Sequence, residues 1–527
     1  MIRMFHISGQ KSSVEIGAKQ NEILHPPIEL TSATDPLYSR FWKDRELAIY
    51  DGFEPVIGLE VHAQLLTESK IFCGCQVAYG DPANSLTCPV CLGLPGALPV
   101  LNRKAVEFAM RGILATGGRV SNRSVFARKN YFYPDLPKGY QISQYDKPIG
   151  EGGEIRCRLG DENKVVRLIR IHLEEDAGKS LHPEHGEPTT RIDLNRCGTP
   201  LVEIVTEADI RSPEEAYGYL VKLKQTVQYL GICSGDMEKG HLRCDANVSV
   251  RPAGTEKFGT RTELKNMNSF KGVERALKYE IDRQINLIKS GGTVVQETLL
   301  WNEKKQVAEA MRSKEESHDY RYFPEPDLLN LEIDDAWIDA VRSSLPELAA
   351  QKAKRFVAQY GLRDYDANVL TDTKELADYY EETMQHTKDG VAASNWIQTE
   401  LLGILNKTGE EISTYKIRPL MIAELVNKVS TGEISGKIAK TVFEEMTVAG
   451  RKPSEIIAAL GLVQITDEGT LIPIVERIIA ANPDNVAKLK SGKSNLFGFF
   501  VGQVMKETKG QANPEIVNQL LKERLDV

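Results

Sequence analysis

Four cysteines form the most specific chemical pattern in the sequence. Cys73 and Cys75 make a C-x-C pair, and Cys88 and Cys91 make a C-x-x-C pair that follows after a spacer of 12 residues. Two close pairs of this kind can place four thiolates tetrahedrally around Zn²⁺, and four sulfur ligands leave no position for a substrate. We therefore expect a structural zinc site, with an unliganded or redox-active cluster as the alternative.

The other four cysteines stand alone in the sequence: Cys157, Cys197, Cys233 and Cys244. Eight cysteines in a chain of 527 residues are too few and too scattered for a disulfide framework. We expect these four to be buried free thiols.

Charged side chains also occur at positions where a strand would carry apolar ones. Residues 56–62 alternate with a period of two, which puts Glu60 and His62 on one face of a strand. Glu175 continues the apolar alternate positions of residues 169–175, and Glu203 interrupts an apolar run at residues 201–205. A buried charge is costly unless a partner compensates it.

A divalent cation could compensate these groups together. Carboxylates with one imidazole suit Mg²⁺ or Mn²⁺, usually with substrate phosphates in the remaining positions. Alternatively, each glutamate pairs with a nearby arginine or lies on a solvated face, because the three segments need not meet in the fold.

Cations interleave with aromatic residues in residues 128–141, a composition that can stack bases and hold phosphates. A packed aromatic loop would have the same composition. Alternation also places Arg243 and Asp245 on one strand face and Glu263 and Lys265 on another. Each face is either the wall of a polar site or a solvated surface. A lysine cluster near the C-terminus could contact a phosphate backbone or simply lie in solvent; its members are Lys488, Lys490, Lys493, Lys506 and Lys509.

Two common catalytic motifs are absent from the sequence. There is no G-x-x-x-x-G-K-[ST] motif, which excludes ATP binding through a P-loop. There is also no G-x-S-x-G motif and no Gly/Ser-rich segment typical of an amidase nucleophile.

Composition is that of an ordinary globular protein. The formal charge is −8, hydrophobic residues make up 41% and charged residues 27% of the chain. The acidic total excludes a general positive coat, so any contact with nucleic acid must be local. No run approaches the ~18 apolar residues of a spanning helix, and residues 1–50 lack the apolar core of a signal peptide. We expect no membrane association and a cytoplasmic location.

Two regions of different periodicity must position the reactive groups. From residue 54 to about residue 327, short alternating or apolar runs predict strands, interrupted by helices. Ser212-Pro213, with Glu215 three residues after the serine, predicts the first turn of one such helix. After residue 345 apolar residues recur at helical spacing, as in Ile438 and Val442. The sequence therefore predicts an α+β domain followed by helices.

Taken together, these segments resemble one family, the B subunits of the tRNA-dependent amidotransferases that make Gln-tRNA(Gln) and Asn-tRNA(Asn). The matching stretches run in family order over about residues 51–527, whereas residues 1–50 have no counterpart. They are VIGLEVH (56–62), RKNYFYPD (128–135), YQIS (140–143), HLEEDAGK (172–179), DLNRCGTPLVEIV (193–205), LRCDANVS (242–249), ELKNMNSF (263–270), DYRYFPEPDL (319–328) and residues 496–514.

The resemblance implies a heterotrimeric enzyme in which this chain is the kinase and transamidase half. Such a chain uses ATP to phosphorylate the side-chain carboxylate of glutamate or aspartate misacylated onto tRNA. Ammonia, which the amidase (the A subunit) releases from glutamine, then attacks the acyl phosphate, and the small C subunit braces the other two. The implied cofactors are ATP, Mg²⁺ or Mn²⁺, and structural Zn²⁺. Glu-tRNA(Gln), Asp-tRNA(Asn) or both fit as substrates.

The resemblance also assigns residues and domains. The family's metal ligands, which are the expected catalytic groups, fall on Glu60, His62, Glu175 and Glu203. Candidates for phosphate contacts are Lys138, Arg243 and Lys265. The implied fold is an α+β cradle domain (51–344) with a mixed or antiparallel sheet, an all-helical body (345–450) and a helical YqeY-like tail that binds tRNA (451–527), after an N-terminal arm (1–50). The competing hypothesis is a zinc-stabilised tRNA-binding scaffold without chemistry of its own.

Overall fold

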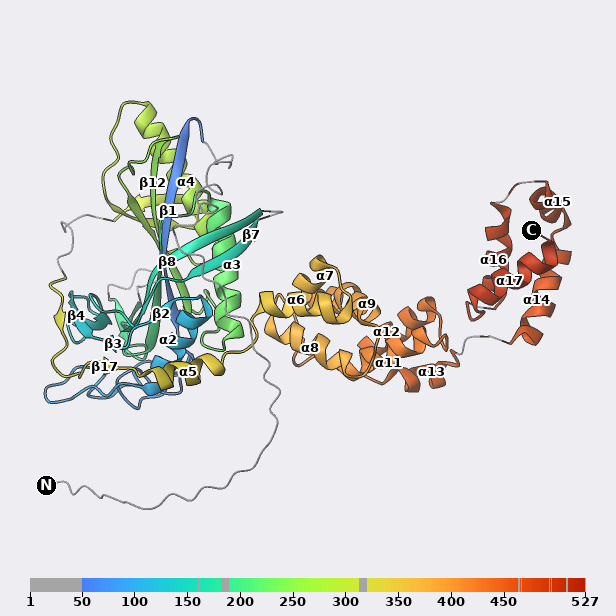
Figure 1. The fold of residues 1–527 in the computed structure, drawn as a ribbon, viewed down its shortest axis with the longest axis horizontal. Helices are drawn as coiled ribbons and strands as arrows, with labels where there is room; N and C mark the ends of the chain where they lie inside the picture. The colour runs from blue at the N-terminus through green and yellow to red at the C-terminus, as the bar shows by residue number, and fades with distance from the viewer. Residues whose placement is uncertain are drawn as a thin grey trace, which may run out of the picture.

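A ten-stranded sheet forms the centre of the N-terminal unit in the computed structural model of the chain (Figure 1). The structure describes residues 50–526 except 160–161, 182–188, 312–319, 463–464, 466, 492, 494 and 509. The expected arm up to residue 49, and Lys509 of the lysine cluster, therefore lie outside the described residues.

The strand order of this sheet is β15-β14-β13-β12-β1-β11-β8-β6-β2, and β7 also pairs with β8. All pairs are antiparallel except β13 with β14, so the sheet is mixed, as predicted. Its strands are β1 (Phe53–Gln64), β2 (Arg119–Val120), β6 (Gly150–Glu151), β7 (Glu154–Leu159), β8 (Glu162–Glu175), β11 (Pro200–Thr206), β12 (Leu242–Pro252), β13 (Thr262–Lys265), β14 (Thr298–Asn302) and β15 (Val307–Ala310).

Three smaller sheets flank the large one. One consists of β4 (Phe126–Asn130), β5 (Tyr140–Gln144) and β16 (Phe323–Pro324), in the order β16-β4-β5. The others are the pairs β3 (Arg123–Ser124) with β17 (Leu331–Glu332) and β9 (Lys179–Leu181) with β10 (Arg191–Asp193).

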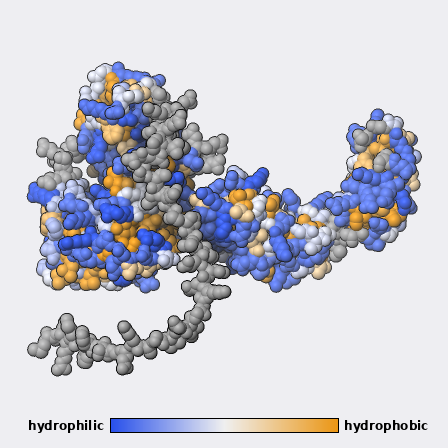
Figure 2. All heavy atoms as spheres, viewed as in Figure 1, coloured by the Kyte–Doolittle hydropathy of each residue, from blue (hydrophilic) through white to orange (hydrophobic). Residues whose placement is uncertain are grey.

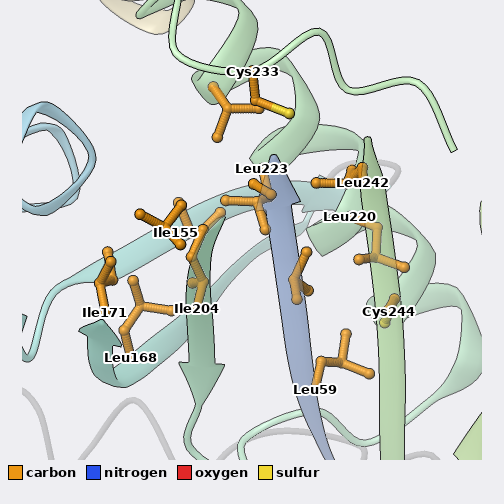
Figure 3. Close-up of a cluster of buried hydrophobic side chains, with 14 of the residues drawn as sticks. Leu59, Ile155, Leu168, Ile171, Ile204, Leu220, Leu223, Cys233, Leu242 and Cys244 are labelled. Atoms are coloured by element: carbon orange, nitrogen blue, oxygen red, sulfur yellow. The ribbon is translucent and has the colours of Figure 1, made fainter. Parts of the chain in front are cut away.

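Helices cover the apolar face of the large sheet. They are α2 (Arg103–Ala115), α3 (Pro213–Tyr229) and α4 (Phe270–Lys289), with α5 (Asp335–Ser343) at the end of the same core. The predicted start of α3 is confirmed, because the Ser212 side chain accepts a hydrogen bond from the Glu215 amide and Pro213 is the first helical residue. Leu220 and Leu223 of α3 lie over Leu59 of β1 and its neighbours (Figure 3). The alternation that buries these residues turns the intervening polar ones to the opposite face.

A second hydrophobic core belongs to a helical body. Its helices are α6 (Ala349–Tyr360), α7 (Asp364–Leu370), α8 (Lys374–Met384), α9 (Gly390–Asn395), the π-helix η1 (Trp396–Leu401), α10 (Leu402–Thr408), α11 (Pro419–Ser430), α12 (Gly436–Ala449) and α13 (Pro453–Leu460). Ile456 and Ile457 of α13 are buried in this core, so the body extends past the expected boundary at residue 450. The Tyr229 hydroxyl donates to the Thr371 carbonyl at 2.8 Å, which ties α3 to the body.

A third core holds the C-terminal tail together. Its helices are α14 (Glu468–Ala480), α15 (Pro483–Lys490), α16 (Leu496–Glu507) and α17 (Pro514–Leu525). Asn513 caps α17 by accepting hydrogen bonds from the Glu515 and Ile516 amides. The predicted α+β domain followed by a helical body and a helical tail is confirmed, and Figure 1 shows the three units in a row.

Hydrophilic residues cover much of the visible face of all three units (Figure 2). Among the helices that the structure describes, none combines the length and apolar character needed to cross a bilayer.

Candidate active site and metal centres

Two rows of ionisable side chains cross the polar face of the large sheet. In one row, His62 of β1 lies opposite Glu203 of β11 and Arg243 of β12, and Glu203 lies opposite His172 of β8. In the next row, Glu60 lies opposite Asp245. Because cross-strand neighbours on one face are only about 5 Å apart, the register brings these charges into contact.

His62 sits between two carboxylates. Its Nε2 atom lies 3.4 Å from Glu174 Oε1 and 3.4 Å from Glu203 Oε2, and both glutamates are buried. His172 Nε2 lies 3.2 Å from Glu203 Oε2. One ligand atom each from His62, Glu174 and Glu203 lies within 4.8 Å of the others, the arrangement that a single cation could bridge.

The electrostatics of this group match a cation site. Burial by itself lowers the pKa of His62, but the hydrogen bond to Glu203 and the charges of Glu203 and Glu174 outweigh burial and raise the pKa to about 9. Burial raises the pKa of Glu203, yet the charge and hydrogen bonds of His172 and His62 hold that pKa well below its usual range. Positive charge between these carboxylates stabilises them, and a proton on His62 or a metal ion can supply it.

Glu60 lies close to this group but makes a different contact. Its carboxylate accepts a hydrogen bond from the Asn247 side chain at 2.9 Å, and it lines the same hollow as His62. Burial and the negative charge of Glu203 raise the pKa of Glu60.

Glu175 is not part of this group. Successive side chains on β8 point to opposite faces, so Glu174 faces His62 whereas Glu175 lies on the face of Ile171 and Leu173. The Glu175 carboxylate contacts the Lys138 ammonium and accepts from the Ile142 amide at 2.8 Å. Burial is the main cause that raises its pKa. Of the four expected ligands the structure thus brings Glu60, His62 and Glu203 to one basin, with Glu174 in place of Glu175.

The basin is a hollow of about 330 Å³ with several cationic groups in its wall. Of the three expected phosphate contacts, Arg243 and Lys265 line it, whereas Lys138 lines a neighbouring hollow together with Glu175. Further cations in the wall are Lys129, Arg170 and Arg196.

Two guanidinium donors in this wall have no partner among the described residues. Arg170 Nε and Arg243 Nε are buried without a hydrogen-bond acceptor there. Buried donors are normally satisfied, so such orphans point to a missing ligand that accepts hydrogen bonds, such as a phosphate.

The sequence pattern of residues 169–175 could have indicated three basin residues that the sequence analysis did not single out. Arg170, His172 and Glu174 alternate with Ile171 and Leu173, which is the pattern of a polar strand face. The pattern shows that the three share a face, but only pairing with β11 shows that this face is the one carrying Glu203 and His62.

Tyr131, directly after β4, and Tyr322, directly before β16, line one side of the basin. Tyr322 stacks on Tyr145 with ring centroids 4.2 Å apart, and the Lys129 ammonium lies 4.8 Å above the Tyr320 ring. Both oxygens of Glu325 accept hydrogen bonds from Arg128 at 2.7 Å, which fastens the segment around β16 to β4.

The four clustered cysteines meet, as their spacing predicts. One sulfur each from Cys73, Cys75, Cys88 and Cys91 lies within 4.8 Å of the others. The Cys88 amide donates to Cys91 Sγ at 3.1 Å. A hydrogen bond from Cys73 is the main cause that lowers the pKa of Cys91. The four isolated cysteines are buried free thiols, as predicted.

Comparison with known proteins identifies the family of the chain. A family described as the GatB/GatE catalytic domain matches residues 55–339, and one described as the GatB domain matches residues 378–525. Relatives named as the B subunit of aspartyl/glutamyl-tRNA(Asn/Gln) amidotransferase share high identity: 54% over 475 residues in Carboxydothermus hydrogenoformans, and 56% over 479 residues in Alkalilimnicola ehrlichii. Each alignment covers 90% of this chain and 99% of the relative. The chain belongs to the GatB family.

Membership of the GatB family confirms the resemblance seen in the sequence motifs. The GatB/GatE catalytic match spans the unit that contains the basin and the cysteine cluster. The second GatB match covers most of the helical body and the tail.

Proposed function

We propose that this chain amidates glutamate or aspartate misacylated onto tRNA, and that the polar basin is where ATP activates the side-chain carboxylate. The observation that carries this proposal is the group formed by His62, Glu174 and Glu203 inside a hollow walled by cations. As the B subunit of a glutamine-dependent amidotransferase, the chain is a component of a carbon–nitrogen ligase.

His62, Glu174 and Glu203 would hold Mg²⁺ or Mn²⁺, with Glu60 beside them. Two carboxylates and one imidazole are a donor set that these ions accept. Such an ion, when bound, neutralises charge on the phosphates during transfer. The buried position of the two carboxylates, and the lowered pKa of Glu203 between two imidazoles, support the fit.

The chain's own cations would bring two anions together. Arg170, Arg243 and Lys265 line the basin. Their charge would offset the repulsion between a substrate carboxylate and the ATP phosphates. Asp176 accepts from Arg243 at 2.8 Å and orients that guanidinium. No side-chain nucleophile is needed, because the substrate carboxylate is itself the attacking group.

The remaining assignments complete the proposal. Ammonia comes from an amidase, the A subunit, which shares a heterotrimer with this chain and a small C subunit in the cytoplasm. Zn²⁺ in the cysteine cluster supports the fold rather than the reaction, because four thiolates fill its coordination. The tail binds tRNA, with Lys488 and Lys490 of α15 as candidate phosphate contacts.

Adjacent residues of β8 provide the test. In the complete complex with ATP, glutamine and misacylated tRNA, Glu174→Gln should abolish acyl-phosphate formation and weaken Mg²⁺ binding. Glutamine hydrolysis and tRNA binding should persist. Glu175→Gln is the matched control, since it changes a buried carboxylate on the opposite face and should leave Mg²⁺ affinity unchanged.

Two outcomes would count against the proposal. Normal acyl-phosphate formation with Glu174→Gln would favour the scaffold hypothesis, with the kinase site elsewhere. Loss of Mg²⁺ binding with Glu175→Gln alone would show that Glu175 is a metal ligand, as the family resemblance implies, and that Glu174 is not.

A further inference from the structure

Lys70 is a buried cation beside the cysteine cluster. Its side chain is among the largest that the structure buries completely. The ammonium donates to the Leu86 carbonyl at 2.7 Å and lies 3.7 Å from Cys91 Sγ. No carboxylate among the described residues lies within 4.0 Å of it, unlike Lys164, which is also buried but pairs with Glu215 at 2.7 Å.

A buried ammonium requires a negative partner. Removing a charge from water costs several kcal/mol unless an opposite charge compensates it. For Lys70 the available partner is the cysteine cluster, because four thiolates around Zn²⁺ carry a net charge of about −2. The Lys70 amide also donates to the Cys75 carbonyl at 2.9 Å, so the same residue contacts both cysteine pairs.

Backbone hydrogen bonds continue from Lys70 to the basin. The Ile71 amide donates to the Gly198 carbonyl at 2.9 Å, and the Gly198 amide donates to the Asp176 carbonyl at 3.0 Å. Gly198 has φ +79°, and a Cβ there would lie 3.3 Å from Cys91 Cβ, so the loop lies directly against the cluster.

The spacer between the cysteine pairs holds the same loop. The Asn84 side chain accepts from the Leu194 amide at 2.8 Å, and the Leu86 amide donates to the Asn195 side chain at 2.8 Å. The loop at residues 194–199, directly after β10, also carries Arg196, which lines the basin and lies 3.4 Å from Asp176.

We infer that Lys70 is the charge partner of a tetrathiolate zinc centre, and that the metal, through Lys70 and this loop, positions Arg196 and Asp176 in the basin. Lys70 is thus a positioning residue for the metal and the metal is a positioning element for the active site. This inference rests on the proposal that the cluster binds zinc.

The zinc affinity of the assembled complex tests whether Lys70 is the charge partner of the centre. It is measured by competition with a chromogenic chelator at fixed pH. Lys70→Met keeps most of the length of the side chain but removes its charge, and should weaken zinc binding by roughly 10–100-fold, the usual effect of losing an outer-sphere partner. Lys164→Met is the matched control, a buried lysine with a carboxylate partner, and should leave zinc affinity unchanged.

A double-mutant cycle distinguishes the electrostatic contribution of Lys70 from its packing contribution. Cys88→His lowers the negative charge of the centre by one, so Lys70→Met should cost at least fivefold less affinity in that background. An equal loss in both backgrounds would show that Lys70 acts by packing and would overturn the charge assignment. Unchanged affinity with Lys70→Met would overturn it as well, while the zinc proposal would stand. A wild-type complex without zinc would overturn both.

Amide hydrogen exchange of the wild-type complex tests whether the metal positions the loop, and needs no variant to fold. A zinc-selective chelator, added in buffer that contains Mg²⁺, should accelerate exchange at residues 194–199, where the Leu194 amide bonds to Asn84. Exchange in β11, at residues 201–205, should stay slow. Unaltered exchange at residues 194–199 after zinc release would refute the link between the metal and the basin.

Discussion

The protonation state of His62 is a sensitive test of the basin. In the metal-free protein its pKa is raised from the usual 6.5 to about 9, chiefly by Glu203 and Glu174 acting against burial. At about 1.36 kcal/mol per pKa unit, this rise corresponds to roughly 3 kcal/mol of interaction that favours the charged imidazole. Because the pKa is raised, this stabilisation is complete below pH 6.5 and is lost as the pH rises through about 9.

Glu203→Gln should remove most of this effect. The amide keeps the shape of the side chain but not its charge, and the burial that remains lowers the His62 pKa. We expect the pKa to fall by at least two units, so that His62 is mostly neutral at pH 7.5. The chain has nine histidines, and ¹³Cε1-histidine NMR titration, with His62→Gln for assignment, measures the shift. Glu175→Gln, on the opposite face of β8, is the control and should leave this pKa unchanged.

Protonation of His62 also competes with metal binding. Since a metal requires the neutral imidazole, Mg²⁺ must displace the proton, and its affinity should rise about tenfold per pH unit between pH 7 and pH 9. A wild-type His62 pKa near 6.5, or one that Glu203→Gln does not change, would refute the electrostatic account of the basin.

Three further predictions address the rest of the molecule. The double variant Cys88→Ser/Cys91→Ser should lose zinc by metal analysis, and undiminished zinc would exclude this site. Glu280→Gln should destabilise the sheet-containing unit by about 3 kcal/mol in chemical denaturation, because the fully buried carboxylate accepts from Thr262 and Arg283; a change below about 1 kcal/mol would contradict this estimate. Truncation after residue 462, which retains α13, should raise the KM for tRNA while glutamine hydrolysis continues, and an unchanged KM would remove the tail from tRNA binding.

Local chemistry made a large part of the fold predictable. Period-two alternation in residues 56–62 places Glu60 and His62 on one face wherever the strand lies, because the geometry of a strand allows no other arrangement. Local pattern also predicted two helical features correctly. Ser212 caps the start of α3, and Ile438 and Val442, at helical spacing, are both buried. The end of the helical body was less predictable, because Pro453 can begin a helix of either unit. Only the burial of Ile456 in the second core assigns α13 to the body.

The sequence by itself determined that carboxylates and an imidazole occupy strand positions, and that two cysteine pairs are spaced for a metal. Only the tertiary structure decided which of two adjacent glutamates on β8 meets His62, because a register shift of one residue would exchange the faces of the strand. Pairing of His172 with Glu203, and of Glu203 with His62, turns Glu174 into the basin and Glu175 away from it. Contacts between distant segments, such as Lys70 with Cys91 and Gly198 with Ile71, have no local signature, because they depend on how the chain folds back on itself.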